Sequence, residues 1–312
     1  MSLAIELSAV VVTVKDNEAL VLCLNLPRGE AAFALPSGPF IPENHRTFDL
    51  ALRAFVREQT GFDIGYVEQL YSFGDDGRQG IAASAPDGDR VVSVGYLALT
   101  PQAVQARFDA AWVPFNRFFP WEDWRRGDNN PDLEVLRPAL RDWCDTAASA
   151  TEHALRLRRV ETIFPDDFDN WNEERVLDRY ELLYSVGLTG EAQRTRDGGP
   201  PAPSSGEPMA SDHRRILATG LSRLRGKLKY RPVIFELMPE QFTLLELQKS
   251  LEALSGLRLH KQNFRRALDR TGFVTPLGIM REDTGGRPAE LYSYNRDQFH
   301  FSPSLGLSLP RA

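Results

Sequence analysis

The stretch Lys227–Asn295 reads KLKYRPVIFELMPEQFTLLELQKSLEALSGLRLHKQNFRRALDRTGFVTPLGIMREDTGGRPAELYSYN. Thr243 is a favourable helix N-cap, and Glu246 stands three residues later, which is the spacing of a capping box. Apolar residues then recur at helical spacing, namely Leu244, Leu247, Leu251 and Leu254. Gly256 marks the end of this helix, because glycine readily adopts the left-handed conformation of a C-cap. The stretch therefore contains a capped, amphipathic helix.

A second helix is predicted from His260 to Thr271, ended by Gly272. One of its faces is expected to be core, with Phe264, Ala267, Leu268 and Thr271. The other face is polar and mostly basic, with Lys261, Gln262, Asn263, Arg265 and Arg266. Arg can bind a guanine edge with two hydrogen bonds, and Gln or Asn can bind adenine in the same way. We therefore predict that these five residues read bases from a recognition helix.

A hairpin is predicted after the second helix. Phe273–Met280 and Ala289–Tyr294 have strand character, and the connection Arg281–Pro288 contains a Gly-Gly-Arg tip. An Arg on such a wing suits a narrow minor groove, where the potential is most negative. Phosphate or groove contacts are expected from Arg270, Arg287, Lys227 and Lys229. The whole pattern predicts a winged helix-turn-helix that binds double-stranded DNA.

Positive charge is concentrated in this part of the chain. Residues 211–312 hold 17 Lys and Arg against 10 Asp and Glu, a net charge of +7, whereas the remainder carries −13 and the whole chain −6. A basic part next to an acidic one is the electrostatic pattern expected when one domain binds DNA and the other does not.

Length and composition exclude several classes of protein. The chain has 312 residues, of which 42% are hydrophobic, enough for two domains with cores of their own. No stretch approaches the roughly 20 apolar residues of a membrane span, and the N-terminus lacks the pattern of a signal peptide. Cys23 and Cys144 are too few for a disulfide framework or a zinc site. We expect a cytoplasmic protein with no membrane contact and no metal centre.

The first 100 residues have the pattern of a compact α/β unit. A helix is predicted at Thr47–Thr60, with Gly61 as its C-cap. Strands are predicted at Ala9–Val14, Ala19–Leu26, Tyr66–Phe73 and Arg90–Leu99.

The middle of the chain is mostly helical in pattern. Helices are predicted at Pro131–Ala150, Thr151–Phe164, Glu173–Val186 and Ser211–Arg225. The first three suit either packing between domains or subunits, or a local insert. Gln193–Met209 has the composition of a flexible linker, with an exposed loop ordered by packing as the alternative. We therefore expect an α/β (α+β) domain at 1–125, to which the resemblance described below assigns effector binding, a helical connecting or dimerisation segment at 126–192, a flexible linker at 193–210 and a winged helix DNA-binding domain at 211–300.

Four segments of the N-terminal part resemble a Nudix domain: LPSGPF at 35–40, REQTGF at 57–62, YVEQLYSFGD at 66–75 and VVSVGYLALTP at 91–101. The resemblance implies a Nudix-like fold. The Nudix box, however, is degenerate. Ala54 and Phe55 stand where the box has Arg and Glu, and Glu58-Gln59 stands where it has a Glu pair. Hard divalent cations need several carboxylate or other oxygen ligands. We therefore expect no catalytic residues, and a cleft that binds a nucleotide without cleaving it.

A degenerate Nudix-like part followed by KYRPVIFELMPEQFTLLELQKSLEAL, HKQNFRRALDRTGFV and GGRPAELYSYN resembles the Nudix-related transcriptional regulators of NAD biosynthesis and salvage. The resemblance covers roughly residues 3–119 and 223–295. It implies a homodimeric repressor on a near-palindromic operator, with NAD, ADP-ribose or ATP as effector. Which nucleotide acts, and with which sign, is open.

Effector contacts are expected around the degenerate box. Phosphates are bound by Arg or backbone amides, and adenine by an aromatic or apolar slot with polar edge contacts. The candidates are Phe40, Arg46, Arg53, Arg57, Glu58, Gln59, Asp75, Arg78, Phe115 and Asn116.

Two other functions stay open. The first is a Nudix pyrophosphatase with an unusual metal site and an appended DNA- or protein-binding module, which metal-dependent hydrolysis of ADP-ribose or NAD would favour. The second is a winged helix that binds a protein, which DNA binding that is insensitive to sequence and weak at moderate salt would favour.

Overall fold

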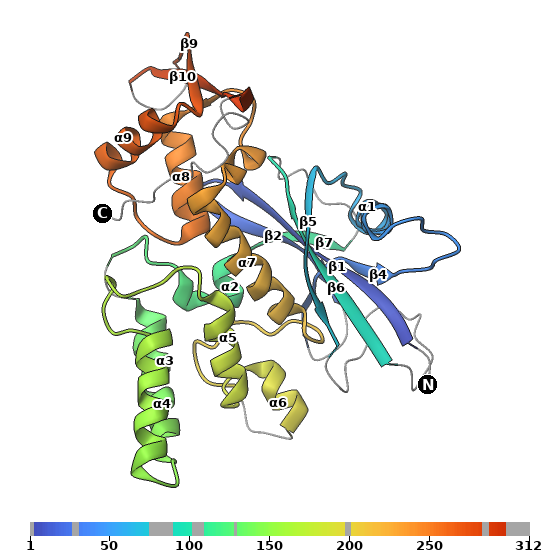
Figure 1. The fold of residues 1–312 in the computed structure, drawn as a ribbon, viewed down its shortest axis with the longest axis vertical. Helices are drawn as coiled ribbons and strands as arrows, with labels where there is room; N and C mark the ends of the chain where they lie inside the picture. The colour runs from blue at the N-terminus through green and yellow to red at the C-terminus, as the bar shows by residue number, and fades with distance from the viewer. Residues whose placement is uncertain are drawn as a thin grey trace.

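The structure, a computed structural model, describes residues 3–26, 31–74, 90–101, 109–127, 130–196, 201–282 and 287–297 (Figure 1). Its N-terminal half contains a mixed sheet, with strand order β3-β2-β1-β6-β5; β4 also pairs with β1, and β7 with β2. The strands are β1 (Leu3–Lys15), β2 (Glu18–Asn25), β3 (Phe33–Ala34), β4 (Ser37–Pro39), β5 (Tyr66–Phe73), β6 (Arg90–Leu99) and β7 (Ala110–Pro114).

Strand β1 organises this sheet. It forms an antiparallel hairpin with β2 through Asp16 and Asn17, whose φ angles of 52° and 62° suit the tight turns that join twisted strands. It also pairs in parallel with β6, from Leu3 opposite Arg90 to Val12 opposite Leu99. Strand β5 is antiparallel to β6 and ends the sheet on that side.

The two faces of the sheet are covered by helices from distant parts of the sequence. Successive side chains of a strand point to opposite faces, so Leu7, Ala9 and Val11 of β1 pack towards helix α1 (Phe48–Thr60). Val10 and Val12 lie on the other face, in the core that contains helix α7 (His213–Tyr230). Gly220 allows α7 to come close, because a Cβ there would lie 3.0 Å from Cγ1 of Val10.

The middle of the chain, which lies between β7 and α7 in the sequence, forms helices. They are α2 (Phe115–Phe118), the 3₁₀ turn η1 (Pro120–Glu122), α3 (Pro131–Asp145), α4 (Ala150–Ile163), α5 (Val176–Ser185) and α6 (Gly190–Arg196). The helix predicted to reach Ala150 ends at Asp145, and Ser149 caps the next helix by accepting from the Glu152 amide. Helices α3 and α4 form a hairpin that projects from the body (Figure 1).

The described residues of the segment expected to be a flexible linker pack against the N-terminal sheet and its helices. Met209 is fully buried. Arg117 pairs with Glu207 at 2.5 Å, and the Ala210 amide donates to the Phe33 carbonyl at 2.9 Å. Helix α7, predicted to start the winged helix domain, covers the sheet instead. The described part of 193–210 is thus ordered by packing, the alternative to a flexible linker. Helix α7 lies on the sheet because the sheet needs a second apolar layer, which this distant helix supplies.

The C-terminal unit has the predicted order of elements. It contains η2 (Val233–Leu237), β8 (Phe242–Thr243), α8 (Leu244–Ser255), α9 (Lys261–Thr271), β9 (Val274–Arg281) and β10 (Ala289–Tyr294), with strand order β8-β10-β9. Both bonds of the Thr243–Glu246 capping box form, and Gly256 and Gly272 have the left-handed C-cap conformation. The hairpin tip at 283–286 lies outside the described residues.

No helix in the described part of the chain is long and apolar enough to cross a membrane.

Candidate nucleic-acid interface and ligand site

Helix α9 presents one polar face and one buried face. Phe264, Leu268 and Thr271 are buried, and Phe264 is only 1% exposed. The five side chains predicted to read bases are all exposed: Lys261, Gln262, Asn263, Arg265 and Arg266. Arg270 is exposed as well. The helix lies with β9 and β10 at one end of the molecule, opposite the α3–α4 hairpin (Figure 1). Its polar face is therefore available for a duplex.

The wing is anchored to the first helix of the motif. Arg281, at the end of β9, donates from Nη1 to Oε1 of Glu246 at 2.6 Å. Arg287, on the far side of the tip, is exposed. The ion pair fixes the base of the wing beside the start of α8, so the tip extends from a defined position.

Lys227 and Lys229 do not belong to this interface. Both lie on α7, and both ammonium groups are in ion pairs with the body of the protein. Lys227 pairs with Glu68 of β5, while Lys229 is 2.9 Å from Glu173 and 2.5 Å from Glu174. Burial opposes the charge on Lys229, but the two carboxylates outweigh it and raise its pKa. The prediction of DNA contacts from these two residues is not supported, since their charges already have partners.

A buried carboxylate connects the N-terminal sheet and its helices to the winged helix unit. Glu122 of η1 accepts from Arg179 Nε at 2.5 Å and Nη2 at 3.1 Å, and from Arg225 Nη1 at 2.5 Å. All three side chains are 3% exposed or less. Burial lowers the pKa of Arg179, although the Glu122 carboxylate opposes this effect. We call Glu122, Arg179 and Arg225 the buried triad.

The buried triad reaches the end of α8. Arg225 Nε donates to the Leu254 carbonyl at 2.9 Å, and the Trp124 amide donates to the Gly256 carbonyl at 2.7 Å. A Cβ on Gly256 would lie 2.1 Å from the Glu122 carbonyl oxygen. The two units therefore meet backbone to backbone at the C-cap of α8. No local sequence pattern predicts this contact beyond the presence of its charged residues.

Two of the predicted effector residues are used to hold α1 in place. Arg53 donates to the carbonyls of Ile64 at 2.5 Å and Gly65 at 3.1 Å, and pairs with Asp49. The Gln59 side chain bonds both the amide and the carbonyl of Ser37, at 3.2 and 2.6 Å. These bonds tie α1 to the loop before β5 and to β4, so both side chains have a structural role.

The other candidates do not form one cluster. Phe40 packs edge-to-face on Phe48, with ring centroids 4.5 Å apart. Arg46, Arg57 and Glu58 are exposed, and Arg57 lies 3.4 Å from Asp63. Phe115 is buried in the core on the α7 side of the sheet. Asn116 borders a small cavity beside the buried triad.

Asp75 and Arg78 lie outside the described residues. Among the described residues, no group of three or more His, Cys, Asp or Glu is placed to hold a metal ion.

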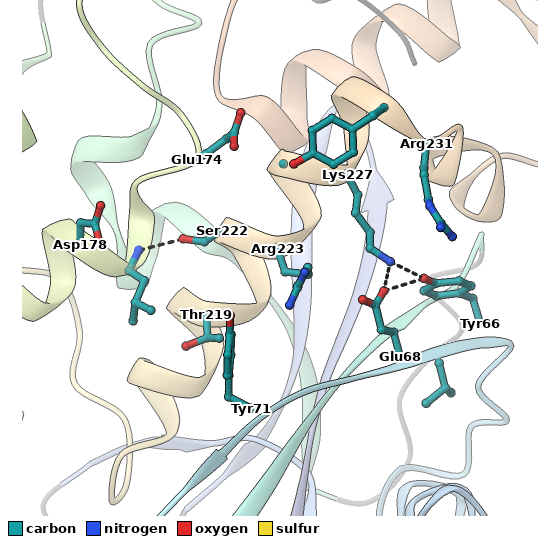
Figure 2. A pocket seen from close by; sticks show the side chains of 14 residues that line it. Tyr66, Glu68, Tyr71, Glu174, Asp178, Thr219, Ser222, Arg223, Lys227 and Arg231 are labelled. Atoms are coloured by element: carbon teal, nitrogen blue, oxygen red, sulfur yellow. Dashed lines mark hydrogen bonds and ion pairs between the residues drawn. The ribbon is translucent and has the colours of Figure 1, made fainter. Parts of the chain in front are cut away.

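The sequence did not predict a cavity beside α7. It has a volume of about 860 Å³ and lies between β5, the start of α5 and the second half of α7 (Figure 2). Lys227 crosses it to Glu68 and also donates to the Tyr66 hydroxyl at 3.1 Å. Burial raises the Glu68 pKa, but hydrogen bonds from Lys227 and Tyr66 outweigh it and lower the pKa. Only the fold brings residues 66–71 next to residues 219–231.

Residues 234–294 match a family model described as the NrtR DNA-binding winged helix domain. The C-terminal unit is thus similar to the NrtR winged helix domain. Over 103 residues the chain is 35% identical to the ADPR responsive transcriptional repressor NtrR of Acinetobacter baylyi. That match spans 33% of this chain and 41% of the relative, less than half of its length.

The fold of the whole chain is also that of NrtR. The crystal structure of Shewanella oneidensis NrtR complexed with a 27mer DNA aligns with a TM-score of 0.57 and 19% identity, covering 97% of each chain. The structure of Shewanella oneidensis NrtR aligns with a TM-score of 0.55, covering 94% of this chain and 95% of that one. The chain thus has a Nudix-like mixed sheet, helices in the middle and a C-terminal winged helix domain, as the sequence predicted.

Proposed function

We propose that the chain is a DNA-binding transcriptional repressor that responds to an adenine nucleotide, with ADP-ribose as the first choice. The observation that carries this proposal is the exposed basic face of α9 within an NrtR winged helix domain. The relative from Acinetobacter is named as an ADPR responsive repressor, and the Shewanella protein was crystallised with DNA. Both names support the proposal. The proposed target genes are those of NAD biosynthesis and salvage.

The proposed binding mode places α9 in the major groove. Lys261, Gln262, Asn263, Arg265 and Arg266 contact base edges, because these side chain types pair with guanine and adenine there. Arg270 and Arg287 contact the backbone or minor groove. A homodimer on a near-palindromic operator supplies two such helices at a spacing of one helical turn.

The Nudix-like unit is proposed to sense the nucleotide without hydrolysing it. Ala54 and Phe55 offer no metal ligand, and the Gln59 amide is hydrogen bonded to Ser37. Effector contacts are proposed for four residues near α1, the half-buried Phe40 and the exposed Arg46, Arg57 and Glu58. An effector changes DNA binding only if it binds the two states of the protein with different affinity.

We further propose that the functional units differ from the sequence boundaries. The sensing unit comprises 1–125 together with α7, because α7 covers the second face of its sheet. The DNA-binding unit then begins after Tyr230.

The test is fluorescence anisotropy on duplexes taken from upstream of NAD synthesis and salvage genes. Wild-type protein is expected to bind one of them in a strongly salt-dependent way, and ADP-ribose to shift the affinity while being recovered intact. Arg265→Ala and Arg266→Ala should abolish specific binding and leave dimerisation unchanged. Arg159→Ala, an exposed arginine on α4, is the matched control.

Wild-type affinity in both α9 variants would show that α9 does not read the operator. Metal-dependent cleavage of ADP-ribose by the pure protein would instead establish the pyrophosphatase.

A further inference from the structure

Helix α7 forms one side of the cavity in Figure 2 and contributes two rows of residues to it. Residues 223, 227 and 231 follow at intervals of four, so Arg223, Lys227 and Arg231 form one row facing β5. Thr219, Ser222, Gly226 and Tyr230 form a neighbouring row, and Glu174, Leu177 and Asp178 also line the cavity. The Ser222 hydroxyl accepts from the Leu177 amide at 2.9 Å, which ties α5 to α7 at the cavity floor.

The row of cations has more positive charge than its partners neutralise. Lys227 is paired with Glu68, and the nearby Glu174 is paired with Lys229. Arg223 and Arg231 are exposed, and within the described residues neither makes an ion pair or a hydrogen bond. Figure 2 shows them on either side of Lys227. Two guanidinium groups therefore remain available on this wall, and guanidinium is well suited to bidentate binding of phosphate.

Two aromatic rings accompany these cations. Tyr71 is 57% exposed, and Arg223 lies over its ring at 5.8 Å from the centroid. Tyr230 is 55% exposed. Gly226 lets the Tyr230 hydroxyl and Glu174 come close to α7, because a Cβ there would lie 3.1 Å from that hydroxyl and 3.4 Å from Glu174 Oε2. Flat rings can stack on either tyrosine.

The remaining polar group is Asp178, in the first turn of α5 on the opposite side of the cavity. A carboxylate accepts hydrogen bonds from hydroxyl groups. The cavity thus combines cations for a phosphate, rings for a flat group and an acceptor for a diol. Its volume falls in the range of small-molecule sites, roughly 300–1,000 Å³.

We propose that this cavity binds a phosphorylated metabolite that carries a flat ring, of mononucleotide size. Arg223 and Arg231 bind the phosphate, Tyr71 or Tyr230 stacks on the ring, and Asp178 accepts from hydroxyl groups. The site is separate from the exposed residues near α1, because α1 and α7 cover opposite faces of the sheet. It does not depend on the proposed DNA binding or on ADP-ribose sensing.

The position of the cavity gives its ligand a route to the winged helix. The cavity includes Tyr230, the last residue of α7, and Arg231, which precedes η2. A ligand held by Arg223 and Arg231 would bridge the sheet edge and the last turns of α7. It would therefore stabilise one orientation of the segment from which the winged helix unit starts.

The experiment is isothermal titration calorimetry of the full chain with three probes: AMP, adenosine and inorganic phosphate. AMP is expected to bind, and each of the other two to bind at least about tenfold more weakly, because each offers only one of the two recognition groups. Arg223→Ala and Arg231→Ala should each weaken AMP binding by about tenfold or more. Arg159→Ala should bind as wild type. Tyr71→Phe should keep the affinity that Tyr71→Ala loses.

Hydrogen exchange locates the bound AMP independently. Protection is expected at 66–71 and 219–231. The proposal is overturned if AMP does not bind the wild type at millimolar concentration, or if both arginine variants bind it unchanged. It is also overturned if adenosine binds as tightly as AMP. None of these results bears on operator binding, which the anisotropy experiment measures separately.

Discussion

Removal of the Glu122 carboxylate should be among the most damaging single changes in this protein. The carboxylate accepts three charge-assisted hydrogen bonds, two from Arg179 and one from Arg225. In Glu122→Ala both guanidinium groups stay buried without a compensating charge. Loss of one partner of a buried ion pair costs about 3–5 kcal/mol. Backbone carbonyls of Ile163 and Asn172 still accept from Arg179, and those of Leu254 and Glu173 from Arg225.

These remaining bonds satisfy N–H groups but do not neutralise charge, so we expect a loss near the middle of that range, about 4 kcal/mol. A typical domain is stable by only about 5–15 kcal/mol. At about 2–4 °C per kcal/mol, the expected fall in Tm is about 8–16 °C. Glu122→Gln keeps the shape and one acceptor oxygen, and should lose less.

The assay is urea unfolding followed by circular dichroism, with Tm measured in parallel. Glu161→Ala, which removes an exposed carboxylate from α4, should stay within about 0.5 kcal/mol of wild type. A loss below about 1 kcal/mol in Glu122→Ala would refute the reasoning, since it would mean that the two arginines are solvated or reorganise once the carboxylate is gone.

Three further changes test other parts of the structure. Gly256→Ala should destabilise the chain by more than about 1 kcal/mol, because the residue has a φ of 72° and its Cβ would meet the Glu122 carbonyl oxygen at 2.1 Å. Urea unfolding measures the loss, and an unchanged unfolding midpoint would contradict the backbone contact. Thr243→Ala removes the N-cap bond to the Glu246 amide and should cost about 1 kcal/mol, whereas Thr243→Ser should cost little in the same unfolding assay. Glu68→Gln should destabilise at neutral pH by about 1 kcal/mol, as expected for a partly exposed pair. The pKa of Glu68 in the folded state is lowered from 4.5. The stability that Glu68 contributes is therefore present above pH 4.5 and is lost as the pH falls through the folded-state pKa. If wild type stayed more stable than Glu68→Gln by the same amount at pH 3, the ion pair with Lys227 would not be the source of that stability.

The buried triad suggests how the two units influence each other. Its carboxylate comes from η1, one arginine from α5 and the other from α7, and Arg225 also holds the C-terminal carbonyl of α8. A movement of α7 relative to the sheet would therefore be transmitted to α8, the first helix of the winged helix motif, through directional bonds. This connection is compatible with an effector signal from either face of the sheet.

The C-terminal unit was readable from sequence because its signals are local. The capping box at Thr243 and the αL glycines at 256 and 272 depend on a few neighbouring residues, and the structure has all of them. The polar face of α9 follows in the same way from helical spacing and the burial of Phe264 and Leu268. Strands β5, β6 and β10 begin and end at the predicted residues.

The sequence alone determined the order of elements, the Nudix-like fold, the winged helix and the polar face of α9, because these follow from periodicity, caps and short motifs. Tertiary structure decided where the charged and aromatic side chains of α7 point. Lys227 was expected on DNA but pairs with Glu68, 159 residues earlier, and Arg225 closes the buried triad with Glu122, 103 residues earlier. Such partners are chosen by which elements cover the two faces of the sheet, and the free energy of that packing is summed over many distant apolar contacts that no local pattern records.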